Sequence, residues 1–247
     1  LKTANAIGLK VEPLFYKIAG MGNPFRGESN HSNYCRPLAL PPVVRLNNSE
    51  KLVILNPEKA LDTDSEDGFW GTFGGISSGD RERYNPLRYY GINLYSILLR
   101  GTMEYRFFNF CTNVRFVDAV ASLSQFISDL MIRAPLSTIA DLPSVSIFEK
   151  NPAIIYHKLF DCLLYMGRCY NSEFQIEPRE IDSLRELIDN TPQPVFSREP
   201  VLSHVRGGRI GIEQALRFGL QVVDSAVEAG YTDIHNFEES DTKLIGD

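Results

Sequence analysis

A glutamate and an arginine stand two positions apart in an aromatic segment that alternates sharply between residue types, from Thr102 to Phe108. Such alternation predicts a strand, in which every second side chain points to the same face. Glu104 and Arg106 should therefore share one face, while Met103, Tyr105 and Phe107 point to a helix-covered core. A buried charge must be paired or bind an ion, so this strand is a candidate functional site.

Arginines gather around this strand, although the chain as a whole carries a net charge of −6. Arginine makes forked contacts with phosphate and carboxylate groups and keeps its charge in any plausible environment. A glutamate among arginines suits a metal-bound polyphosphate, in which the carboxylate holds Mg²⁺ and the guanidinium groups neutralise phosphate oxygens. The alternative is structural: Glu104 and Arg106 pair across strands, and the other arginines lie in a solvated loop. The arginines concerned are Arg81, Arg83, Arg88, Arg100 and Arg106.

Two motifs and a following helix resemble the amidoligase family of phages and bacteria. The motifs are Arg88-Tyr-Tyr-Gly-Ile-Asn-Leu-Tyr95 and Gly101-Thr-Met-Glu-Tyr-Arg106, and an amphipathic helix follows from about Val114 to Arg133. The resemblance covers about 50 of the 247 residues. Amidoligases belong to the glutamine-synthetase-like carboxylate–amine ligases. The resemblance therefore implies an α+β fold, with an antiparallel sheet as the wall of the active site and helices behind it.

The resemblance also implies a reaction and its participants. ATP would phosphorylate a carboxylate, and an amine would displace the phosphate to form an amide or isopeptide bond, with Mg²⁺ or Mn²⁺ offsetting the negative charge. The substrates would be small-molecule or peptide carboxylates and amines. The implied roles are catalysis for Arg106 and Arg88, nucleotide or acceptor binding for Arg83, Asn93 and Arg100, and metal binding for Glu104 and Glu12.

The opening of the chain matches the family only in part. Amidoligases typically begin with a Gly-x-Glu-x-Glu strand whose two carboxylates bind metal. The nearest equivalent is Gly8-Leu-Lys-Val-Glu12, where Lys10 takes the first acidic position and Glu12 remains as a ligand candidate. His31, the only histidine before the motifs, lies in a polar loop. Either the missing carboxylates lie on a segment before Leu1, or the domain has lost catalysis and kept the fold.

Turn residues and periodicity predict the remaining elements. Up to residue 79, glycines and prolines predict short strands and loops: a strand at 51–55, an acidic solvated loop at 62–67 and a glycine-rich connecting loop at 71–79. Apolar residues at helical spacing predict helices at 114–133, with one face on a sheet, and at 152–169, 178–189 and 212–229. The expected domains are an amidoligase-like catalytic domain over 1–145 and a helical C-terminal region over 146–247.

Composition limits the class of protein and its partners. With 43% hydrophobic and 23% charged residues, the chain has the balance of a globular protein. Its negative charge argues against broad binding to nucleic acid or to anionic lipid, and no apolar run is long enough to span a bilayer. We expect a cytoplasmic protein, located in the host cytoplasm or the virion if phage-encoded. Its cysteines, interpreted as buried free thiols without zinc-site spacing, are Cys35, Cys111, Cys162 and Cys169.

Two functions from different classes follow. The first is an ATP-dependent carboxylate–amine ligase. The second is a non-catalytic structural or interaction protein, for example a component of a phage particle, which keeps the amidoligase fold and binds a protein partner or a second copy of itself. The groups around Glu104 distinguish the two: converging carboxylates favour catalysis, whereas an apolar or basic surround favours the structural function.

Overall fold

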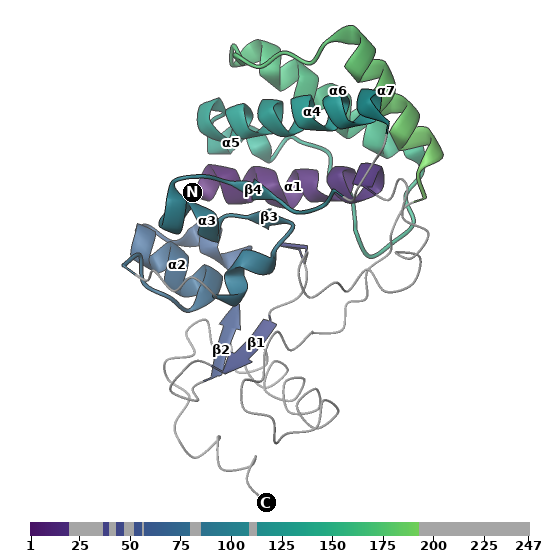
Figure 1. Cartoon of the computed structure of the whole chain (residues 1–247). Helices are drawn as coiled ribbons and strands as arrows, with labels where there is room; N and C mark the ends of the chain where they lie inside the picture. The colour runs from purple at the N-terminus through teal and green to yellow at the C-terminus, as the bar shows by residue number, and fades with distance from the viewer. Residues whose placement is uncertain are drawn as a thin grey trace, which may run out of the picture. The chain divides into compact units, whose positions relative to one another are not determined.

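The computed structural model describes residues 1–19, 37–39, 43–46, 52–55, 57–79, 85–108 and 113–192. The chain divides into two compact units (Figure 1). Unit 1 comprises Leu1–Leu38 and Leu87–Ser197, and unit 2 comprises Ala39–Pro86 and Arg198–Asp247. The domain boundary expected at residues 145/146 falls inside unit 1, because helices from both sides of it pack together. The helix expected at 212–229 lies outside the described residues.

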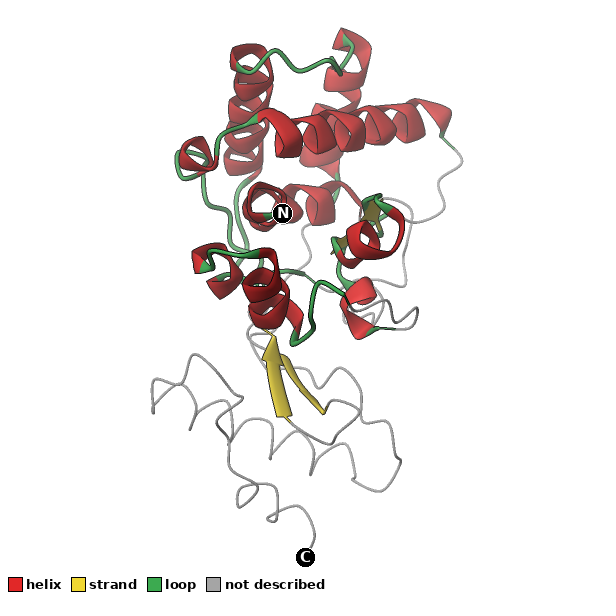
Figure 2. Cartoon of the chain, turned by 90° about the vertical axis from the view of Figure 1, so that its left-hand side faces the viewer, coloured by secondary structure: helices red, strands yellow, loops and turns green. Residues whose placement is uncertain are grey.

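Helix α1, Lys2–Ala19, lies at the centre of unit 1 and contacts α4, α5, α6 and α7. Figure 2 shows it nearly end-on among those helices. The expectation of strands and loops at the start of the chain was therefore wrong. Most of the helix from Ala4 on is buried, so its apolar residues do not form the one-sided stripe of a surface helix. Gly8 and Pro13 lie inside it, although such residues often interrupt helices.

Four further helices build the rest of this core. The Asn113 side chain caps α4 by accepting a hydrogen bond from the Arg115 amide, and α7 opens with a capping box between Glu177 and Glu180. α4 packs mainly against the helices α1, α6 and α7 and not on an extended sheet as predicted. The bounds are Val114–Arg133 for α4, Leu136–Ile139 for α5, Ala153–Cys169 for α6 and Pro178–Asn190 for α7.

The motif region forms a small hairpin instead of a long strand. Strands β3, Ile92–Asn93, and β4, Glu104–Tyr105, pair antiparallel, and helix α3, Tyr95–Arg100, connects them. A short 3₁₀ helix, η3, precedes them at Pro86–Tyr89. Gly101 ends α3 with a φ of 68°, a left-handed conformation that glycine adopts without strain. Unit 1 is thus mostly helical in its described part, with one two-stranded antiparallel sheet.

Unit 2 contains a second hairpin and a short helix. Strands β1, Val43–Leu46, and β2, Leu52–Leu55, pair antiparallel, and β2 confirms the strand predicted at 51–55. The 3₁₀ helix η2, Lys59–Asp62, is followed by α2, Glu66–Gly74, whose first turn is capped by Ser65. The predicted glycine-rich loop is therefore largely helical up to Gly74. Its helix is held by a buried aromatic cluster of Phe69, Trp70 and Phe73.

Candidate functional site

The register of the hairpin places Asn93 directly opposite Glu104. The Asn93 Nδ2 group donates a hydrogen bond of 2.8 Å to Oε2 of Glu104. The other end of the same amide, Oδ1, accepts from the Ser96 backbone N–H at 3.2 Å. Because that N–H belongs to the first turn of α3, one asparagine side chain joins the strand pair to the start of the helix.

Arg106 completes the cluster from the strand end. Its Nη2 donates to the same Oε2 atom of Glu104 at 3.0 Å, and its backbone N–H donates to the Gly91 carbonyl at 2.8 Å. The Arg106 side chain is 18% exposed and that of Glu104 is 44% exposed. The direct contact thus confirms the prediction that Glu104 and Arg106 lie on the same side of the segment.

Two of the three intervening apolar residues, Tyr105 and Phe107, point to the core as the alternation predicted, whereas Met103 is only half-buried. The Tyr105 ring lies 5.2 Å from that of Phe15 on α1, and its hydroxyl is 2.9 Å from Oγ of Ser128 on α4. Burial raises the pKa of Tyr105 to about 12, with the Ser128 hydrogen bond acting in the opposite direction. Phe107 is fully buried and stacks on Phe15 at 5.1 Å. The apolar side of the segment therefore packs against both α1 and α4.

The charge of Glu104 is stabilised by its neighbours. Burial by itself would raise the pKa of this carboxyl, but hydrogen bonds from Asn93 and Arg106, and the charges of Arg106 and Arg88, outweigh it. The pKa of Glu104 is therefore lowered, and the carboxylate is held in its ionised form. Its surroundings are two guanidinium groups and an amide, which is the basic environment that favours the structural function.

The other predicted site residues either lie apart from the Asn93–Glu104–Arg106 cluster or act on it without a hydrogen bond that the structure shows. Arg88, in η3, is half-buried and acts on Glu104 through its charge. Arg100 is exposed in the last turn of α3, and Arg83 lies outside the described residues. Glu12 is buried on α1, where Oε2 accepts the Leu38 backbone N–H at 2.6 Å. Lys10, in the first acidic position of the family pattern, donates to Ser144 Oγ at 2.7 Å.

No strand carries Glu12, because the segment that would hold the first family motif is helical. Within the ranges that the structure describes, no group of three or more His, Cys, Asp or Glu side chains is placed to hold a metal ion. The thiols expected to be buried are in fact half-buried at Cys162 and exposed at Cys169, and both are free. Cys35 and Cys111 lie outside the described residues.

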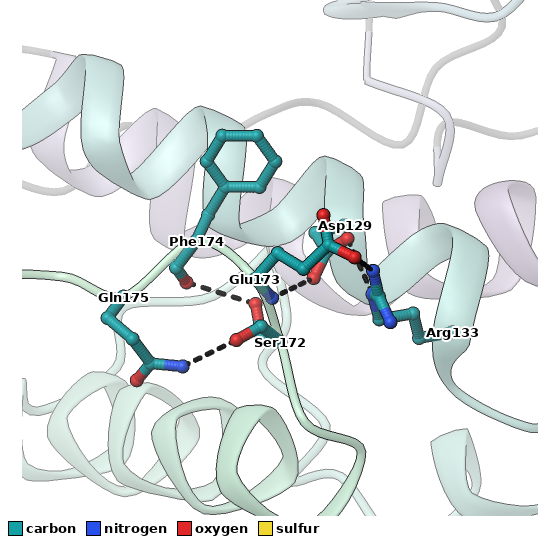
Figure 3. Close-up of polar contacts among 6 residues, drawn as sticks. All are labelled: Asp129, Arg133, Ser172, Glu173, Phe174 and Gln175. Atoms are coloured by element: carbon teal, nitrogen blue, oxygen red, sulfur yellow. Dashed lines mark hydrogen bonds and ion pairs between the residues drawn. The ribbon is translucent and has the colours of Figure 1, made fainter.

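Sequence reasoning missed a polar cluster between α4 and the α6–α7 connection (Figure 3). Asp129 is buried, and its carboxylate accepts from Nε of Arg133 at 2.8 Å and from the Glu173 backbone N–H at 2.9 Å. Arg133 also pairs with the Glu173 carboxylate. Asp129 and Arg133 stand four residues apart on a helix, a spacing that indicates an ion pair. That spacing could not predict that the loop between α6 and α7 would bring Glu173 to the same pair.

A second missed group is the buried Lys17 near the end of α1. Its ammonium donates to the carbonyl of Thr191, which caps the C-terminus of α7, and lies 5.8 Å from the centre of the Tyr156 ring. Burial lowers the pKa of Lys17, while the charge of Asp189 acts in the opposite direction. A cation at a helix C-terminus is favourable, so Lys17 holds the end of α7 against α1.

The lowered pKa of Lys17 predicts a dependence of stability on pH. Between the folded pKa and the unfolded value of 10.5, the unfolded state binds more protons, so the free energy of unfolding should rise with pH. Lys17→Met removes this contribution. We expect urea unfolding, as the pH rises toward 10.5, to show a steeper rise in the free energy of unfolding for the wild type than for Lys17→Met. Lys158→Met, at an exposed position on α6, should keep the wild-type slope; equal slopes for all three proteins would contradict the prediction.

Comparison of the chain with protein-family models, with curated proteins and with solved structures found no match. The resemblance to amidoligases thus depends on the motifs at 88–95 and 101–106 and on the helix that follows them. Among the described helices, none is both long and apolar enough to cross a membrane.

Proposed function

We propose that the chain is a non-catalytic interaction protein in which the amidoligase-like residues of the hairpin serve as a structural tie. The observation that carries this proposal is the bonding of Glu104. One of its oxygens accepts hydrogen bonds from both Asn93 and Arg106, and Asn93 also holds the start of α3. These contacts join both strands of the hairpin to α3.

The surroundings of Glu104 also support this proposal. A magnesium site in a ligase needs carboxylates that converge on the ion, whereas guanidinium groups oppose a cation. Arg88 and Arg106 both act on Glu104 with positive charge. On the far side of the segment, Tyr105 and Phe107 anchor the hairpin to the aromatic core around Phe15. A charged face and an apolar face together fix the hairpin on the helical unit.

The ATP-dependent carboxylate–amine ligase on a glutamine-synthetase-like fold is the second candidate. Its supporting observation is that Arg88 from η3, Asn93 from β3 and Arg106 from the β4 segment all act on Glu104. The Nε atom of Arg106 is also buried and has no hydrogen-bond partner within the described part of the chain. An unsatisfied guanidinium N–H is a feature that a bound phosphate or carboxylate oxygen would satisfy.

Glu104→Gln separates the two functions. For a structural tie, loss of the carboxylate leaves Arg106 without its anion, and we expect the free energy of unfolding to fall by about 1 kcal/mol. Chemical denaturation of the full chain measures this loss. Glu58→Gln, at an exposed carboxylate of unit 2, should change stability little. For a ligase, Glu104→Gln should instead leave the melting temperature nearly unchanged and abolish nucleotide binding that depends on Mg²⁺ or Mn²⁺.

The same proteins are assayed for ATP binding by calorimetry and for ADP release with a panel of carboxylates and amines. Turnover by the wild type, lowered roughly 10²–10³-fold in Arg106→Lys, would overturn the proposal in favour of the ligase. Absence of metal-dependent ATP binding, together with the loss of stability in Glu104→Gln, would support the structural tie.

A further inference from the structure

No further inference is drawn: the strongest candidate, the side-chain cluster of Lys17, His157 and Asp189 where α1, α6 and α7 meet, rests on the lowered pKa of Lys17 alone, from which the dependence of stability on pH is already derived.

Discussion

Replacing Gly167 with alanine is expected to lower the free energy of unfolding by about 2–3 kcal/mol. Gly167 is buried on α6, where the helix approaches α4. A Cβ atom at this position would lie 2.6 Å from Cζ of Phe126 and closer still to Cε2. The Phe126 ring is 2% exposed and has no room to move away, so the two helices would have to separate.

Gly91→Ala should also lower the free energy of unfolding. Its Cβ would clash with the ring of Phe107 and would lie 2.9 Å from the hydroxyl of Tyr16. Gly71→Ala is the matched control. It lies inside α2 with no atom within 4 Å of the new Cβ, so alanine should raise stability by about 0.5–1 kcal/mol through helix propensity. Urea denaturation of the three variants gives the comparison. A Gly167→Ala protein as stable as the wild type would mean that α4 and α6 do not approach as closely as described.

Asp129→Asn is expected to cost about 2 kcal/mol near neutral pH, because it removes the buried anion that Arg133 and the Glu173 amide surround. Burial would raise the pKa of Asp129, but hydrogen bonds from Arg133, Ser172 and the Glu173 amide, with the Arg133 charge, lower it below its ordinary value of 3.8. A lowered folded pKa gives stability that is present above the unfolded value and lost as pH falls through the folded one.

The difference between wild type and Asp129→Asn should therefore be largest near pH 7 and shrink in acid below pH 3.8. Urea unfolding at several pH values measures it. Asp118→Asn is the control, with the same chemical change at an exposed position of the same helix. A loss in Asp129→Asn that stays constant into acid would show that the asparagine disrupts packing and that the charge of Asp129 contributes little.

The sequence predicted the surface helices of unit 1 better than its centre. The bounds of α4 and α7 followed from one-sided apolar stripes. α1 could not be found in this way, since it is covered by helices on several sides and its buried residues include Asn5, Glu12 and Lys17. Burial of these polar groups depends on partners far along the chain, such as Thr191, which no local pattern reveals.

The candidate site was predictable in its local part only. The two-residue period of a strand placed Glu104 with Arg106 and turned Tyr105 toward the core. The contact of Asn93 with Glu104 depends on the register of β3 against β4, and that register depends on how α3 and Gly101 close the hairpin. For this reason the sequence indicated which charges would meet but not that an amide would join them.

The central position of α1 has a consequence for synthesis of the protein. α1 precedes α6 and α7 in the chain, yet both pack against it, together with α4. A ribosome adds about 5–20 residues per second, so the apolar surface of α1 waits on the order of 10 s or longer before α7 is available to cover it. During that time the helix lacks the long-range contacts that stabilise it, and its exposed side chains are open to aggregation. Production of the folded chain should therefore be sensitive to the supply of chaperones that hold nascent hydrophobic segments.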